Sequence, residues 1–173
     1  MESVEETLQT ILDASPKAIS SDSQFSSHHQ KLKSMAISAQ RPDLLGSDRE
    51  EKALIHQWIN FTLNHLASSA ASSASPTPEA RALVDELNAR LSSRAFVAGG
   101  DRLSLADLVL FAATRAHFAA ISFQEKERLV NASRWFAHVQ ERVREDRSQR
   151  GFGIGKELPN IVFVRNRLYH LAL

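Results

Sequence analysis

The stretch Phe96-Val-Ala-Gly-Gly-Asp-Arg-Leu-Ser-Leu-Ala-Asp107 decides the fold. In its last four residues, the side chain of Ser104 can accept a hydrogen bond from the amide of Asp107, while Asp107 reaches back to the amide of Ser104. This capping box predicts the start of a helix, and the run Leu105–Ala120 that follows is apolar nearly all round. Because a helix without a polar face is normally buried, we expect it to form the centre of a helical bundle.

The sequence before this central helix predicts two more helices. One begins at Ser47 or Asp48 and carries two neighbouring apolar stripes, made of Leu54, Trp58, Phe61 and Leu66 and of Ile55, Ile59 and Leu63. We expect Trp58 to be buried in the core. The other helix begins at Pro78, with Thr77 as its cap, after a linker rich in Ser and Ala.

The sequence after the central helix predicts a short amphipathic helix over 123–130 and a longer one capped by Asn131 or Ser133. The longer helix carries Trp135 and Phe136 on its apolar side. Residues 144–159 are first charged and then rich in Gly, and the motif Gly151-x-Gly-x-Gly155 within them predicts a flexible loop. The apolar run that begins at Ile161 is compatible with a strand or with a last helix.

Residues 1–45 differ from the rest of the chain. They contain a short helical pattern that Pro16 interrupts, a Ser-rich stretch from Ser20 to His29, and a possible short helix over Lys31–Ala39. We therefore expect two parts, a reduced N-terminal segment over 1–45 and a helical domain over 46–173.

Composition excludes several classes of protein. The 21 Lys and Arg residues nearly balance the 20 Asp and Glu residues, which argues against a broad surface for nucleic acid or membranes. The absence of cysteine excludes disulfides, thiolate zinc sites and a Cys nucleophile. No signal peptide and no run of about 18 apolar residues is visible. A soluble intracellular protein is the expectation.

The stretch 96–107 resembles the centre of the C-terminal domain of glutathione transferases. Three further segments narrow the resemblance: Leu44-Leu-Gly-Ser-Asp-Arg-Glu-Glu-Lys-Ala53, Asn131-Ala-Ser-Arg-Trp-Phe-Ala-His-Val-Gln140 and Ile161-Val-Phe-Val-Arg-Asn-Arg-Leu-Tyr169. With them, the chain resembles the elongation factor 1 epsilon family, the small non-enzymatic scaffold proteins of the multi-tRNA-synthetase complex. The resemblance covers roughly residues 44–170 and falters at 141–159.

This resemblance implies a mainly α fold, with a glutathione-transferase-like helical bundle after a degenerate thioredoxin-like segment. It also implies a non-catalytic adaptor, without cofactor, metal or catalytic residues, that pairs with transferase-like domains. The implied partners are methionyl-tRNA synthetase and glutamyl-prolyl-tRNA synthetase, with elongation factor 1 subunits as further candidates. The implied location is the cytoplasm, with the nucleus as a second possibility.

A reduced glutathione transferase is the alternative in the class of enzymes. Such enzymes need an N-terminal Tyr, Ser or Cys for the thiolate and a proline loop for the peptide. The only Tyr is Tyr169, no Ser ends a recognisable strand, and neither Pro16 nor Pro42 has a suitable context. About 45 residues is also too short for the usual N-terminal domain, because one βαβ unit alone takes about 30.

Three weaker motifs suggest binding of a metal, a phosphate or RNA. His28-His29 lies in a Ser-rich stretch without a carboxylate pair, and Gly151-x-Gly-x-Gly155 neither follows a strand nor carries a Walker lysine. The basic residues of 142–156 are interleaved with Glu and Asp, so a solvated face is favoured over a tRNA-binding module. We expect no direct binding of nucleic acid.

The candidates for contact with a protein partner are three residues: Arg134, Glu141 and Gln57. Arg134 precedes the apolar pair Trp135-Phe136 and should therefore point outward, where a guanidinium can stack and form paired hydrogen bonds. In the resembled family, the matching Arg anchors a contact between two domains. The alternative is an ordinary surface Arg paired with Glu141. Gln57, on the helix that contains Trp58, is the candidate for a second surface, while Ser104 and Asp107 are assigned to folding.

Overall fold

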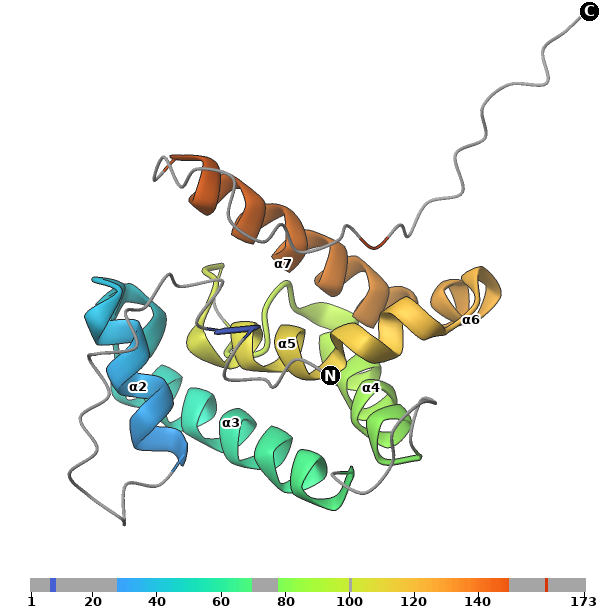
Figure 1. Cartoon of the computed structure of the whole chain (residues 1–173), viewed down its shortest axis with the longest axis horizontal. Helices are drawn as coiled ribbons and strands as arrows, with labels where there is room; N and C mark the ends of the chain where they lie inside the picture. The colour runs from blue at the N-terminus through green and yellow to red at the C-terminus, as the bar shows by residue number, and fades with distance from the viewer. Residues whose placement is uncertain (1–6, 9–27, 70–77, 100, 150–160, 162–173) are drawn as a thin grey trace, which may run out of the picture.

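The computed structural model describes residues 7–8, 28–69, 78–99, 101–149 and 161. Its elements, in order, are α2 (His28–Ser38), the 3₁₀ turn η2 (Pro42–Leu45), α3 (Arg49–Ser69), α4 (Pro78–Arg90), the 3₁₀ turn η3 (Leu91–Ser93), α5 (Leu105–Ala120), α6 (Phe123–Arg128) and α7 (Val130–Gln149) (Figure 1). The predicted mainly α fold is confirmed, and no strand occurs in these described ranges. Among the described helices, none is long and apolar enough to cross a membrane.

Helix α5 lies in the middle of the molecule, with α3 on one side and α7 on the other (Figure 1). Every residue from Leu105 to Phe111 is buried, which fits the nearly uniform apolar character of the segment. Phe118, near the end of α5, packs against Phe136 of α7 with ring centroids 4.6 Å apart. The central helix thus provides the surface on which α3, α4 and α7 pack.

The carboxylate of Asp107 connects three segments inside this core. It accepts hydrogen bonds from the backbone N–H of Val97 (3.0 Å), the N–H of Ser104 (3.0 Å) and Nε1–H of Trp135 (2.8 Å). The hydroxyl of Ser104 also donates to it, and Ser104 and Asp107 form a complete capping box. Burial raises the pKa of Asp107, against the opposing effect of these hydrogen bonds. One buried side chain therefore fixes the loop before α5, the start of α5 and the position of α7.

The apolar stripes of α3 differ from the expectation for Trp58. Ile55 and Ile59 are buried, whereas Leu54, Trp58 and Phe61 are only half-buried. The indole of Trp58 donates from Nε1 to the carbonyl oxygen of Val97, 3.1 Å away. Because this bond holds the ring at the edge of the bundle, the prediction that Trp58 belongs to the buried core is wrong.

Helix α7 begins earlier than the two predicted caps allow. It starts at Val130, so neither Asn131 nor Ser133 precedes it as a cap. Instead, Oδ1 of Asn88 on α4 accepts from the N–H groups of Asn131 (3.0 Å) and Ala132 (3.1 Å). The helix continues to Gln149, so the charged first part of the 144–159 stretch is helical. The residues over 150–160 lie outside the described part of the chain.

The N-terminal part is described only in pieces. Helix α2 begins three residues before the predicted Lys31, and it buries Leu32 and Met35. A following turn reverses the chain, with Gln40 at φ 57°. Arg41 bonds to both carboxylate oxygens of Asp43 and also to Asp146 of α7 (2.7 Å). This arginine therefore ties the N-terminal part to α7. The predicted thioredoxin-like character concerns residues that lie mostly outside the described ranges.

Candidate partner-binding surface

A groove of about 330 Å³ lies between α3 and α4. Its walls come from α3, from α4 and from the chain that follows η3: Leu54, Gln57, Trp58, Phe61, Glu86, Ala89, Arg90, Ser93, Arg94 and Val97. The groove therefore includes Gln57, one of the predicted partner-binding residues, which is exposed.

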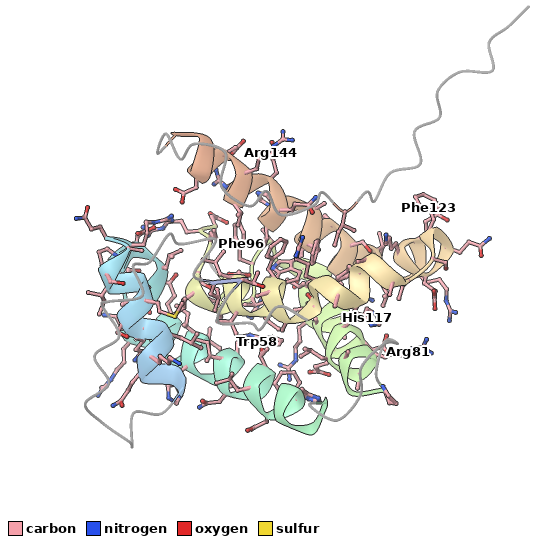
Figure 2. The ribbon with its side chains drawn as sticks, in the orientation of Figure 1. Trp58, Arg81, Phe96, His117, Phe123 and Arg144 are labelled. Carbon is pink, nitrogen blue, oxygen red and sulfur yellow. The ribbon has the colours of Figure 1, made fainter. Side chains whose placement is uncertain are left out.

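Three half-buried apolar side chains of α3 line the groove. Leu54, Trp58 and Phe61 follow one another at helical spacing, so they share one face of the helix. Trp58 and Phe61 meet edge to face, with ring centroids 5.6 Å apart, and the labelled Trp58 can be followed in Figure 2. The Trp58–Val97 hydrogen bond fixes this pair in place. Aromatic rings that are held rigidly and remain partly exposed suit contact with another protein.

Charged residues border the groove on the α4 side. Nε of Arg90 donates to Glu86 one turn earlier, at 2.8 Å. Arg94 is exposed and has no carboxylate partner among the described residues. The groove thus combines an apolar wall with a basic end.

Arg134 lies beside this basic end. It is exposed, while the following Trp135 and Phe136 are buried. Its Nη2 donates to the carbonyl oxygens of Leu91 (2.8 Å) and Arg94 (3.3 Å). The guanidinium therefore covers the end of the turn that also supplies Arg94 to the groove.

The predicted residues fall into separate places. Gln57 lines the groove together with Arg94 of the 91–94 turn, and Arg134 donates to the carbonyl oxygen of the same Arg94. Glu141 lies elsewhere, on the exposed side of α7, where it accepts from Arg144 at 3.0 Å. The alternative in which Arg134 pairs with Glu141 is absent. Ser104 and Asp107 lie in the core and do not reach the groove.

Sequence reasoning missed Arg94 and Val97 as parts of this surface. Both lie after η3, in a segment without helical periodicity that turns back along α3. The spacing of Glu86, Arg90 and Arg94 at four-residue intervals was the one available signal. It could have placed Arg90 with Glu86, but not the turn against α3.

The described residues contain no group of three or more His, Cys, Asp or Glu side chains that could hold a metal ion. The side chains of His28 and His29 and the whole Gly151–Gly155 motif lie outside the described part. In the basic region, Arg144 bonds to Glu141 and Arg142 lies 3.7 Å from Glu145. Where the region is described, its charges are therefore mixed.

A family model described as the nuclear-export cofactor Arc1p matches residues 51–143, which is more than half of the chain. Elongation factor 1 epsilon-1 of Mus musculus is 33% identical over 131 residues, covering 76% of this chain and 67% of the relative. The tRNA-aminoacylation cofactor arc1 of Schizosaccharomyces pombe is 32% identical over 105 residues, or 61% and 21% of the two chains. The bifunctional glutamate/proline–tRNA ligase of Cricetulus griseus is 30% identical over 139 residues, or 80% of this chain and 8% of the ligase.

Proposed function

Because the chain belongs to the family of the nuclear-export cofactor Arc1p, we propose that it is a non-catalytic adaptor that binds aminoacyl-tRNA synthetases. The resemblance to the elongation factor 1 epsilon family, predicted from the sequence, is confirmed by relatives of that name. Relatives named as an elongation factor and as a tRNA-aminoacylation cofactor support a role in translation without catalysis.

The observation that carries the proposal is the similarity to a small part of a glutamate/proline–tRNA ligase. The similar region makes up 80% of this chain but only 8% of the ligase. A synthetase therefore carries a domain of the same kind as this chain. Domains of one fold often pair through equivalent surfaces, so the matching domain of glutamyl-prolyl-tRNA synthetase is the first partner to test. Methionyl-tRNA synthetase and elongation factor 1 subunits follow as candidates.

We place the partner on the groove between α3 and α4 and on the adjoining Arg134. The half-buried stripe of Leu54, Trp58 and Phe61 supplies apolar area, and the edge-to-face ring pair holds its shape. Arg94 and Arg134 supply guanidinium groups without carboxylate partners in the described part of the chain. An acidic residue at the rim of the partner would complement them.

The test measures binding between this full chain and the matching domain of glutamyl-prolyl-tRNA synthetase by titration calorimetry. Gln57→Arg places a long charged side chain at the groove, and we expect it to weaken binding at least tenfold, or about 1.4 kcal/mol. Gln124→Arg is the matched control, because Gln124 is exposed on α6 and does not line the groove. Circular dichroism verifies that both variants keep the helical content.

Arg134→Ala tests the second part of the surface. We expect it to weaken the complex by about 2 kcal/mol if the guanidinium is an anchor. Arg134→Lys keeps the charge but loses the planar donor geometry, so a loss similar to that of the alanine variant would identify hydrogen bonding as the cause. The proposal fails if the wild type binds no synthetase domain, or if Gln57→Arg and Gln124→Arg behave alike.

Two alternatives remain testable by simple binding experiments. A reduced glutathione transferase requires saturable binding of glutathione. A tRNA-binding module acting through 142–156 requires an affinity for tRNA that falls steeply with salt. The pairing of Arg144 with Glu141 reduces the charge available for that interaction. We also propose a location in the cytoplasm and the nucleus, which imaging of a tagged chain would test.

A further inference from the structure

A second hollow lies where α4, the end of α5 and α6 meet, and it has a volume of about 270 Å³. Its lining is polar and comes from all three helices: Arg81, Asp85, Asn88, His117, Ile121, Glu125, Arg128 and Leu129. The α4 residues of this pocket differ from those of the groove, which are Glu86, Ala89 and Arg90. The pocket is therefore a separate place, unrelated to the proposed partner surface.

The buried imidazole of His117 points to a ligand at this pocket. Its side chain is almost completely buried, with 4% of the residue surface exposed, and its Nδ1 has no hydrogen-bond partner among the described residues. Figure 2 labels His117 and Arg81 on the side of the molecule where α4 lies. Burial lowers the pKa of His117, so the ring is neutral near pH 7 and offers one donor and one acceptor. Buried polar atoms in proteins are seldom left without a partner.

Asn88 also lines this pocket, and the orientation of its side-chain amide is fixed. Its Oδ1 accepts from two N–H groups of α7, at 3.0 and 3.1 Å, and these two bonds determine which end of the amide is oxygen. The NH₂ group of Asn88 therefore has a set orientation. It has no acceptor among the described residues.

The charges around the pocket are balanced but incompletely paired. Arg81 approaches Oε1 of Glu125 only to 3.6 Å, and Oε2 of Glu125 is taken by the capping box with Ser122. In the described part of the chain, the side chains of Asp85 and Arg128 form no ion pair with each other or with another residue. One carboxylate and one guanidinium thus remain available at a single pocket.

We propose that this pocket binds a small zwitterion of the α-amino acid type. The ligand carboxylate lies toward Arg128 and Arg81, and its ammonium group toward Asp85. A simple anion or a simple cation satisfies only one of these two charges and is repelled by the other. The volume is about nine times the ~30 Å³ that one water molecule occupies in the liquid, which is enough for a small amino acid. Since the pocket is open to solvent, the affinity is in the millimolar range.

The test follows the ring resonances of His117 by NMR while L-alanine is added to the full chain. We expect saturable shifts with a dissociation constant of about 1 mM. Acetate carries only the carboxylate, methylammonium carries only the ammonium group, and glycine betaine carries both charges but no N–H donor. Each of these three should bind at least tenfold more weakly than L-alanine.

Two variants and one control decide whether the pocket is responsible. Asp85→Asn and Arg128→Gln each remove one of the unpaired charges, and each should weaken binding of L-alanine about tenfold, the change in affinity for about 1.4 kcal/mol. Glu127→Gln is the control, because Glu127 is an exposed neighbour that does not line the pocket. The proposal is overturned if no saturable shift appears up to about 10 mM, if acetate binds as well as L-alanine, or if all three variants bind alike. These outcomes are independent of the synthetase experiment, because Gln57 and Arg134 do not touch this pocket.

Discussion

Replacement of Asp107 tests how far one buried carboxylate holds the bundle together. In Asp107→Ala, the N–H groups of Val97 and Ser104 and the indole N–H of Trp135 lose their acceptor inside the core. Each buried donor without a partner lowers the free energy of unfolding by about 1–3 kcal/mol. Removal of a buried charge offsets part of this loss, because its desolvation penalty disappears. We therefore expect a loss of about 3–5 kcal/mol, a large part of the ~5–15 kcal/mol that stabilises a typical domain.

Asp107→Asn removes the ionisable carboxyl group but keeps the size and shape of the side chain. The amide oxygen can still accept from Val97 and Trp135, but the NH₂ group then faces the N–H of Ser104. One donor is left without an acceptor, so we expect a loss of about 1–3 kcal/mol. Ser104→Ala removes the hydroxyl of the capping box and should cost about 0.5–2 kcal/mol. The predicted order of destabilisation places the alanine variant at position 107 first.

Urea unfolding followed by far-UV circular dichroism measures these differences, with unchanged slopes indicating the same unfolding transition. A second arm varies pH. Because burial raises the folded-state pKa of Asp107 above its unfolded value of about 3.9, the folded state keeps a proton that the unfolded state has lost. As the pH rises from the unfolded-state pKa of Asp107 to its folded-state pKa, the free energy of unfolding of the wild type relative to that of Asp107→Asn therefore falls. If Asp107→Asn unfolds within about 0.5 kcal/mol of the wild type, the carboxylate is not the connection described here.

Three further predictions concern other parts of the fold. Asn88→Ala removes the acceptor for the first N–H groups of α7 and should cost about 0.5–2 kcal/mol in urea unfolding, whereas an unchanged midpoint would mean that water replaces the amide. Gly46→Ala should lower the melting temperature by a strain of about 1–3 kcal/mol, because φ is 87° and the new Cβ would lie 3.1 Å from Cδ1 of Ile55; an equally stable variant would contradict this backbone. Burial, together with Arg81 and against Glu125 and Asp85, lowers the pKa of His117, so acidification from about pH 7 to about pH 5 should destabilise the wild type more than His117→Gln. Equal losses in the two proteins would exclude His117 as the source.

The helices were predictable because their signals are local. The sequence Ser-Leu-Ala-Asp and the apolar run after it identified the start and the burial of α5, since a capping box and periodicity involve residues within a few positions. The same local reasoning could not choose between the two stripes of α3. Ile55 and Ile59 are buried, whereas Trp58 is half-buried and donates a hydrogen bond to Val97, 39 residues away, a contact that no local pattern contains.

The start of α7 and the extent of the candidate surface depended on contacts that no local pattern contains. Asn88 caps α7 from another helix, 43 positions earlier in the chain, whereas the local sequence predicts Asn131 or Ser133 as the cap. Arg134 could be placed outside the core from its buried neighbours. Its bonds to Leu91 and Arg94, and hence its position beside the groove, follow only from the tertiary fold.

The turn at 91–94 lies between the groove and Arg134 and contacts both. It contributes Ser93 and Arg94 to the groove, and two of its carbonyl groups hold Nη2 of Arg134. A displacement of this short segment therefore alters the groove and releases or restrains the guanidinium in the same movement. If one molecule bound in the groove and another at Arg134, and each shifted the turn, thermodynamic linkage would require each to change the affinity of the other by the same factor. The 91–94 turn is thus the segment that the groove and Arg134 share.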